Sequence, residues 1–150
     1  MKPRTTILLV VLCILHSCAE KSPNRKIDRI YFENGQLRRE VKIVNGLKEG
    51  AMTDYYNTGK LHSIRNFLHN IQCGKSTFYH EDGITLKEVQ YYDQQGLRTE
   101  GDTLWYKNGV IEFTADFKNG QKNGLLARYD STGKILYRAN FKNDTLQFVY

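Results

Sequence analysis

Apolar and polar residues alternate along much of the chain, and this alternation is the first structural signal. It is clearest in the segments 111–117 and 135–141, where every second residue is apolar or aromatic. A period of two is typical of β-strands that turn one face toward a core. The sequence therefore predicts strands at these positions.

A glycine recurs at a nearly constant interval and divides the chain into five copies of one unit. Successive glycines of this set are separated by 24, 24, 26 and 24 residues. The set consists of Gly35, Gly59, Gly83, Gly109 and Gly133. A second turn signal of the Asn-Gly type follows in each copy, and both signals suit the positive φ angles that reverse a strand. Each unit is therefore predicted to be a β-hairpin followed by a turn into the next unit.

An aromatic residue stands four positions before each of these glycines. The column consists of Tyr31, Tyr55, Tyr79, Trp105 and Tyr129. Because stacked hairpins without helices have few other large residues to bury, we expect this column to form the core. The residues that follow it are predicted to point to the opposite face and to form a partner-binding face. They are Phe32, Tyr56, His80, Tyr106 and Asp130.

Five tandem hairpins with a 24-residue period predict an all-β fold. We expect an elongated antiparallel meander of roughly ten short strands, either a single sheet or a β-solenoid-like rod, in which each strand pairs with its neighbours in sequence. The segment 146–150 is predicted to be a partial last strand that covers an edge. Both extra residues of the third copy fall between Gly83 and Gly96, and Thr85 stands where other copies have Leu or Ile. Two residues preserve the parity of a strand, so the pattern is expected to continue, with a bulge or bend at this copy.

The first eighteen residues have the layout of an export signal. Lys2 and Arg4 precede an apolar run of eleven residues, 5–15, and the tetrad Leu15-His16-Ser17-Cys18 follows. The run is shorter than the roughly 17 apolar residues that a spanning helix needs, which favours a cleaved signal peptide. The tetrad resembles the lipobox of bacterial lipoproteins, and this resemblance implies cleavage before Cys18 and lipidation of Cys18. A secreted protein without lipid is the alternative, because His16 replaces the small residue usual in a lipobox.

These signals divide the chain into three parts. Residues 1–17 are the expected lipoprotein signal peptide, residues 18–29 the lipidated cysteine and a flexible tether, and residues 30–150 the repeat domain. We expect an exported protein, anchored by its N-terminal lipid to a membrane of the cell envelope, with the outer membrane favoured. Since Cys13 leaves with the signal peptide and Cys18 carries lipid, Cys73 remains alone and an internal disulfide is excluded.

Charge changes this picture little. The net charge is +6, but basic residues alternate with acidic ones and form no stripe of the kind that nucleic-acid binders carry. The ten tyrosines and only two prolines agree with strands. We therefore expect no nucleic-acid partner.

Two constellations of reactive side chains are considered and set aside. The first is a potential metal site within residues 62–80, formed by His62, His69, Cys73 and His80. These residues lack the close pairs of typical four-ligand sites, so we expect neither a metal nor another cofactor. The second consists of the carboxylates Glu81, Asp82, Glu88 and Asp93. They suit turns and an outward face better than a catalytic cleft, and the common catalytic motifs are missing, so a non-enzyme is predicted.

The repeated unit, Tyr-Tyr-x-x-Gly-x-Leu followed by Phe-x-Asn-Gly and a further glycine, resembles the MORN-repeat variant. Residues 105–124 show it well, and the resemblance extends over residues 30–144. It implies a non-catalytic binding role, as protein-interaction or membrane-associating scaffold, and a likeness to the YwqK-like group, which carries an antitoxin label.

The expected function is a lipid-anchored repeat scaffold that binds another protein of the cell envelope, with a homodimer also open. Two alternatives remain at this point. One is an antitoxin-like or immunity-like protein that neutralises a partner effector, and the other is an envelope glycan-binding module.

Overall fold

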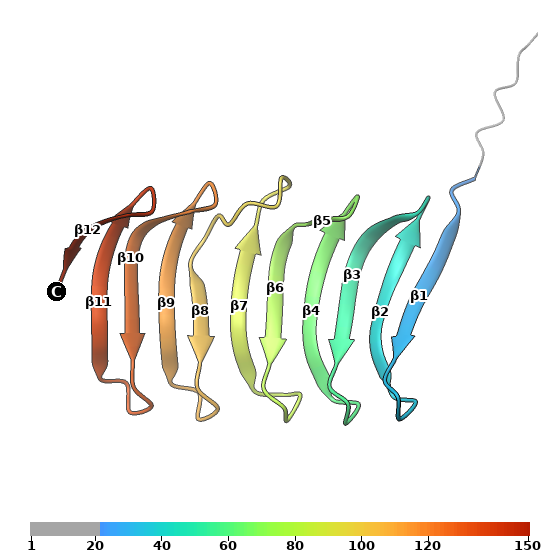
Figure 1. Cartoon of the computed structure of the whole chain (residues 1–150), viewed down its shortest axis with the longest axis horizontal. Helices are drawn as coiled ribbons and strands as arrows, with labels where there is room; N and C mark the ends of the chain where they lie inside the picture. The colour runs from blue at the N-terminus through green and yellow to red at the C-terminus, as the bar shows by residue number, and fades with distance from the viewer. Residues whose placement is uncertain (1–21) are drawn as a thin grey trace, which may run out of the picture.

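The computed structural model describes residues 22–150, which form one open antiparallel β-sheet (Figure 1). Its twelve strands follow the order β1-β2-β3-β4-β6-β7-β8-β9-β10-β11-β12, and β5 pairs with β4 off this path. The strands are β1 (Arg25–Tyr31), β2 (Leu37–Val44), β3 (Leu47–Tyr55), β4 (Leu61–Leu68), β5 (Ile71–Gln72), β6 (Gly74–Tyr79), β7 (Leu86–Tyr92), β8 (Asp102–Trp105), β9 (Ile111–Lys118), β10 (Gln121–Tyr129), β11 (Ile135–Lys142) and β12 (Thr145–Val149). The predicted all-β meander of hairpin repeats is confirmed, and it is a single sheet.

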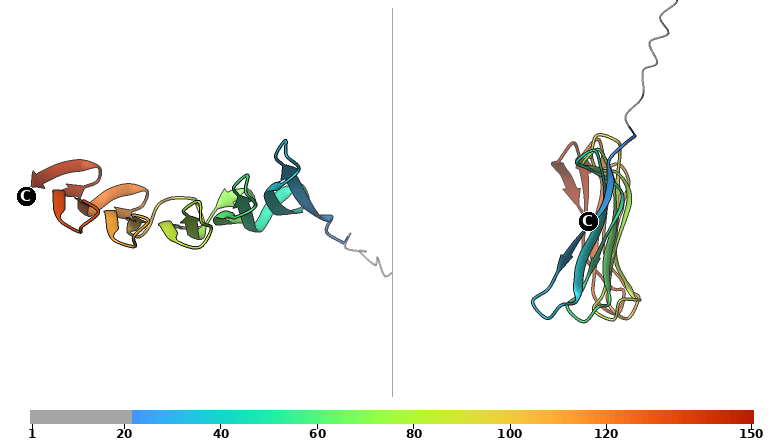
Figure 2. Two further views of the ribbon diagram at one scale, coloured as in Figure 1. Left: turned by 90° about the horizontal axis from the view of Figure 1, so that it is seen from below. Right: turned by 90° about the vertical axis from the view of Figure 1, so that its right-hand side faces the viewer.

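The sheet is longest in the direction that crosses its strands, and Figure 2 shows a single row of strands with no second layer over the part of the chain described. Strand β12 pairs with β11, as expected for the partial last strand. No helix capable of crossing a membrane occurs among the described residues.

The repeat domain begins earlier than the sequence suggested. Strand β1 includes residues 25–29, which the sequence places in a flexible tether. These residues pair with β2, beginning with Arg25 opposite Val44. Residues 25–29 contain one apolar residue, Ile27, among four charged ones, so apolar–polar alternation gave no strand signal there. The expected signal peptide and the lipidated Cys18 lie outside the described residues.

The lower hairpins in Figure 1 share one turn geometry, except the one between β6 and β7. In the first, the Gly35 N–H donates to the Phe32 carbonyl at 2.9 Å and the Phe32 N–H donates to the Gln36 carbonyl at 2.8 Å. The φ angle of Gly35 is +82°, as in a type I turn closed by a left-handed residue. All five predicted turn glycines have positive φ; they are Gly35, Gly59, Gly83, Gly109 and Gly133.

The turns at the upper ends of the strands are mostly two-residue turns with positive φ at both central positions, which defines type I′. They are Asn45-Gly46, His69-Asn70, Asn119-Gly120 and Asn143-Asp144. This type matches the right-handed twist of the strands on either side, and the Asn-Gly signal predicted it.

The third copy departs from the pattern in a way that the sequence did not reveal. Its lower turn runs from His80 to Thr85 and contains one residue more than the others, and Ile84 in this turn is 83% exposed. One extra residue reverses the parity of the following strand, so Leu86, rather than Thr85, pairs with Tyr79. The second extra residue follows β7 and restores the parity. The expectation that both residues act together as a parity-neutral insertion is therefore wrong.

A β-bulge interrupts each lower hairpin at the aromatic column. The register shifts at five places, which are Ile30/Tyr31, Asp54/Tyr55, Phe78/Tyr79, Leu104/Trp105 and Arg128/Tyr129. In each hairpin the returning strand carries one residue more than its partner. Bulges raise the local twist and redirect side chains, so the aromatic column lies at a bend rather than within a regular ladder.

The register assigns the buried residues mainly to one side of the sheet, which we call face A. Face A is defined by Val41, Met52, Asp54, Ser63, Phe67, Ser76, Gln90, Asp102, Ala115 and Ala139, which are all buried. The strands are bowed along their length (Figure 2). Because the described chain has no second layer, neighbouring side chains of the same sheet shield the buried residues of face A.

The aromatic column is not the core. Tyr31 is 56% exposed and the other four members are only half-buried. The apolar core instead contains a cluster of Val41, Met52 and Phe67, with Ile43 packed against it. The column stands where strands end at the lower turns, and there the sheet has no second layer to cover large rings.

Candidate functional site

Face A carries a charged hollow over strands β2, β3, β4 and β6. We call it the basic hollow, because its lining contains three arginines and one carboxylate. It is lined by Phe32, Arg38, Arg39, Asp54, Tyr55, Tyr56, Asn57, His62, Ser63, Arg65 and Phe78. Consecutive copies contribute these residues from strands and from lower turns, so the hollow exists only where the repeats stack.

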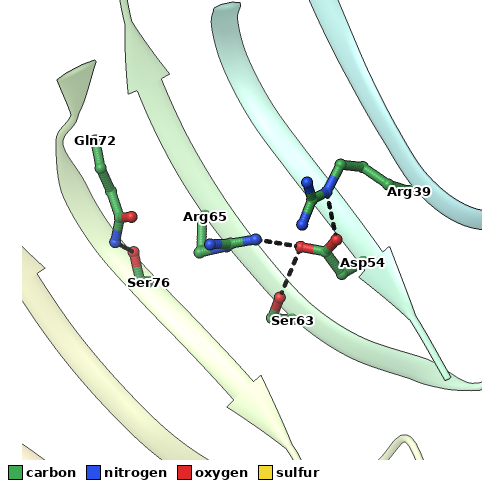
Figure 3. A network of polar contacts seen from close by, with 6 residues as sticks. All are labelled: Arg39, Asp54, Ser63, Arg65, Gln72 and Ser76. Atoms are coloured by element: carbon green, nitrogen blue, oxygen red, sulfur yellow. Dashed lines mark hydrogen bonds and ion pairs between the residues drawn. The ribbon is translucent and has the colours of Figure 1, made fainter. Parts of the chain in front are cut away.

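Asp54 is the centre of this hollow and holds two arginines (Figure 3). Arg39 Nε donates to Asp54 Oδ1 at 2.6 Å, and Arg65 Nη2 donates to Oδ2 at 2.5 Å. Ser63 Oγ also donates to Oδ2, at 3.2 Å. Burial alone would raise the pKa of the Asp54 carboxyl, but the hydrogen bonds and charges of Arg65 and Arg39 outweigh it and hold this pKa below its usual value. The group of two arginines and one carboxylate therefore keeps a net positive charge at neutral pH.

Aromatic rings form the wall of the basic hollow beside this charge. The His62 ring contacts the Tyr56 ring edge-on, with centroids 4.7 Å apart, and lies 6.3 Å from the Phe78 ring. Burial lowers the pKa of His62, with Lys87 and Arg65 acting in the same direction and Asp54 against it. His62 is therefore mainly neutral at pH 7, and the positive charge of the hollow comes from the arginines.

The residues predicted as a partner-binding face also join successive repeats. Tyr56 Oη donates to the Tyr79 carbonyl at 2.7 Å, and Tyr106 Oη donates to the Tyr129 carbonyl at 2.9 Å. The His80 Nε2 atom lies 2.9 Å from the Trp105 carbonyl, which accepts when that nitrogen is protonated. Burial raises the pKa of the Tyr56 hydroxyl, and Glu81 and Asp82 raise it further. The side chains of Tyr56, His80 and Tyr106 therefore connect neighbouring repeats, in addition to being partly exposed.

Phe32 and Asp130 occupy the same position in the first and last copies. Phe32 lines the basic hollow, and the Arg38 guanidinium lies 5.8 Å from the centre of its ring. Asp130 is directed into its own turn, where its Oδ1 accepts from the Thr132 and Lys134 N–H groups. Partner contact through Phe32, Tyr56, His80 and Tyr106 stays a prediction.

A second hollow lies on face A over strands β7 to β11, and we call it the acidic hollow. It is lined by Glu88, Asp102, Leu104, Glu112, Phe113, Leu126, Arg128 and Tyr137. Leu126 pairs with Ala115 on one side and with Ala139 on the other. The equivalent positions of earlier copies carry the larger residues Val41, Arg65 and Gln90. The small side chains leave space above the sheet at this place.

The acidic hollow is lined by more carboxylates than cationic side chains. Glu112 Oε1 lies 3.6 Å from Arg128 Nη2, so the two side chains form an ion pair but are too far apart for a hydrogen bond. Asp102, with a side chain 7% exposed, pairs with Arg98 through Oδ2, while its Oδ1 has no hydrogen-bond partner. Buried polar atoms without a partner are uncommon in native structures, so this oxygen is an acceptor in need of a donor.

The potential metal ligands do not come together. His62 packs between rings, His80 faces a main-chain carbonyl, and the His69 Nε2 atom lies 3.2 Å from Glu49 at an upper turn. Cys73 is a half-buried free thiol. Within residues 22–150, no group of three or more His, Cys, Asp or Glu side chains is placed to hold a metal ion.

The acidic residues considered for catalysis have separate positions. Asp82 Oδ1 accepts from the Ile84 and Thr85 N–H groups, and hydrogen bonds from Thr85 and Ile84 hold the pKa of Asp82 far below its usual value. Asp93 closes a turn in the same way, and Glu81 is exposed in its turn. Glu88 differs from the expectation of an outward position, because it lines the acidic hollow on face A.

Sequence reasoning missed the arginines and the carboxylate of the basic hollow. One signal was present: Asp54 stands at a position where the other copies carry Ile30, Phe78, Leu104 or Arg128. A buried carboxylate at this position needs cationic neighbours, and both Arg39 and Arg65 lie on strands that pair with β3.

Comparison with protein families supports the reading of the repeats. The family model of the MORN repeat variant matches residues 29–45, 48–69, 72–93 and 122–143, which is more than half of the chain. The unmatched β8–β9 hairpin has the same turn and bulge as the matched hairpins. No curated protein and no solved structure matches the chain. The chain belongs to the MORN repeat variant family.

Proposed function

We propose that this protein is a non-catalytic, lipid-anchored repeat scaffold that binds another protein of the cell envelope through face A. MORN repeats are generally protein- or membrane-interaction modules and generally non-enzymatic, which supports a binding role in the broad sense. The protein partner, the lipid anchor and the envelope location are parts of the proposal.

The basic hollow is the observation that carries the proposal. It combines arginines with aromatic side chains, Tyr56 and Phe78 among them, and no described element of the chain covers it. Aromatic residues and arginine are enriched where proteins bind one another, because they bury a large area and make directional hydrogen bonds. A single-layer sheet also needs no rearrangement to present this face.

The anchor in the proposal is Cys18. With β1 beginning at Arg25, about six residues separate the proposed lipid from the sheet. Two or three acyl chains hold a protein firmly on a bilayer without a spanning helix. The sheet would then stand close to the membrane surface, and its partner is expected in the same compartment.

The test is mild cross-linking of cells that express the tagged full-length protein, followed by purification and mass spectrometry. The variant Arg38→Glu changes the basic hollow at an exposed arginine, and Cys18→Ala removes the proposed anchor. Lys75→Glu is the matched control, because Lys75 is an exposed cation on the opposite face of β6.

One stoichiometric protein is expected with the wild type and with Lys75→Glu, and less of it with Arg38→Glu and Cys18→Ala. Absence of any enriched protein in all four samples would overturn the proposal and favour a glycan or lipid ligand. Equal recovery from Arg38→Glu and wild type would show that the basic hollow is not the binding surface.

A further inference from the structure

The two hollows lie next to each other along one row of face A, and we call this row with its two hollows the groove. Cα partners in the register connect them without a gap from strand to strand. The row reads Arg39, Asp54, Ser63, Phe78, Glu88, Leu104, Phe113, Arg128 and Tyr137. Phe78 lines the basic hollow and its partner Glu88 lines the acidic one, so the linings of the two hollows are adjacent at β6 and β7.

The two ends of this groove have opposite charge. The lining of the basic hollow contains three arginines against Asp54, since His62 is mainly neutral at pH 7. The lining of the acidic hollow contains three carboxylates and one cation, Arg128. Arg98 pairs with Asp102 from outside the lining, which makes the net negative charge of the hollow smaller but does not remove it. A ligand that fills the groove is thus favoured if its own charges are arranged in the complementary order.

Each end suits a particular side chain. At the acidic end, Leu104, Phe113 and Leu126 offer an apolar surface for the alkyl stem of Lys or Arg. The same hollow is lined by Glu88 and Glu112, whose carboxylates can attract the cation at the end of that stem. At the basic end, the half-buried Arg39 and Arg65 both donate hydrogen bonds to Asp54. Their remaining N–H groups can donate to a carboxylate of the ligand.

The separation of the ends sets the length of the ligand. Five strand-to-strand steps lead along the row from Asp54 to Phe113, which directly follows Glu112 of the acidic hollow. At about 4.8 Å per step this is roughly 24 Å, which an extended polypeptide covers in about seven residues. A small ion or a single side chain would fill only one end.

We propose that the groove on face A binds an extended segment of the partner protein that carries an acidic residue and, about seven positions away, a Lys or Arg, with small or apolar residues between. This inference rests on the proposed function and adds the chemistry of the bound segment.

The test uses purified full-length protein carrying Cys18→Ala and three fluorescent twelve-residue peptides of Val, Thr and Ser. The first carries Glu and Lys seven positions apart, the second carries Glu and Lys side by side, and the third carries Gln at both places of the first. Fluorescence anisotropy at low and at physiological salt measures binding, because exposed charge interactions weaken as salt rises.

The first peptide is expected to bind at least tenfold more tightly than the other two, and less tightly at the higher salt. Arg38→Glu and Glu112→Lys should each weaken its binding at least fivefold. The matched controls are Lys75→Glu and Glu100→Lys, exposed charges outside the groove, and they should leave binding unchanged.

Equal binding of the three peptides, or no binding of any, overturns the inference. The cross-linking result separates this failure from that of the proposed function. If a protein partner is lost with Arg38→Glu but no peptide binds, face A is a docking surface for a different kind of segment. If neither experiment detects a ligand, the proposed function fails as well.

Discussion

The hydroxyl of Tyr56 donates a hydrogen bond to the main-chain carbonyl of Tyr79, which lies 23 residues further along the chain, over an oxygen–oxygen distance of 2.7 Å. Tyr106 repeats this contact with Tyr129, also 23 residues away. The side chain of one repeat thus satisfies a main-chain group at the bulge of the next. Since a bulge leaves main-chain groups outside the regular ladder, the contact stabilises the stacking of repeats where pairing is weakest.

Tyr56→Phe should lower the free energy of unfolding by about 1 kcal/mol, because it removes one hydrogen bond and leaves the Tyr79 carbonyl half-buried without a donor. The double variant Tyr56→Phe/Tyr106→Phe should lose about twice as much, since the two sites are far apart and act independently. Urea unfolding followed by circular dichroism measures both. Tyr55→Phe, at the neighbouring position of the aromatic column, is the control. A double variant as stable as the wild type would contradict the structural role of these hydroxyls.

Asp54→Asn should destabilise the fold by about 2 kcal/mol at pH 7, because it leaves two arginines beside each other on face A without their shared carboxylate. The estimate is below that for a fully buried pair, since Arg39 is about one-third exposed. Ser63→Ala is the matched control, because it removes only the weaker neutral hydrogen bond to the same carboxylate.

The stabilisation from Asp54 should depend on pH in one direction. Its folded pKa is lowered, and that of the unfolded chain is about 3.9. The contribution is therefore complete above the unfolded pKa and disappears as the pH falls through the folded pKa. The stability difference between wild type and Asp54→Asn should shrink as the pH falls below about 4, and a difference that does not shrink between pH 5 and pH 2 would show that charge is not its cause.

Local signals were sufficient to predict most of the fold. Gly35 and its counterparts specify the lower turns, Asn45 and its counterparts the upper turns, and the alternation between them specifies strands. Each strand pairs with a neighbour in sequence, so the order of the sheet follows without long-range information. The sequence could not show that the described sheet has no second layer over the bulges at the aromatic column, and the core cluster contains Val41 and Met52 instead of these rings.

The site was harder to predict because it depends on register. Arg39, Asp54 and Arg65 lie in different strands, and a shift of one residue in any strand would separate them. The position of Ile84 illustrates this limit, since counting residues could not show that one insertion lies in the lower turn and the other beyond β7. Once the register is known, the row of residues across face A follows directly.

Gly124→Ala should destabilise the protein by more than about 1 kcal/mol through strain and a clash. The φ angle of Gly124 is +128°, and an added Cβ would lie 2.8 Å from the Asp116 Cβ. Asp116 Oδ2 also accepts from the Leu125 N–H at 2.9 Å and is not free to move away. Gly50→Ala is the control at the equivalent bend, with a φ of +78° and no atom within 4 Å of the added Cβ.

Thermal unfolding of both glycine variants measures the difference. Gly50→Ala reports the cost of a left-handed backbone at a φ of +78°, and the additional loss in Gly124→Ala combines the greater strain of a φ of +128° with the contact with Asp116. Equal melting temperatures for the two variants would mean that neither the φ of Gly124 nor the contact with Asp116 adds a cost.

His62 should titrate below pH 6.5, because burial between Tyr56 and Phe78 disfavours its charged form, and Lys87 and Arg65 add to this effect. A group whose folded pKa is lowered contributes stability that is present above its unfolded pKa and decreases as the pH falls through the folded pKa. Wild type should therefore lose stability between pH 7 and pH 5 relative to His62→Phe, which keeps a ring between the same neighbours. Histidine NMR signals followed from pH 8 to pH 4.5 give the pKa of His62 directly. A pKa of His62 above its ordinary value of about 6.5 would mean that the attraction of Asp54 exceeds the effect of burial, and the basic hollow would then gain another positive charge at neutral pH.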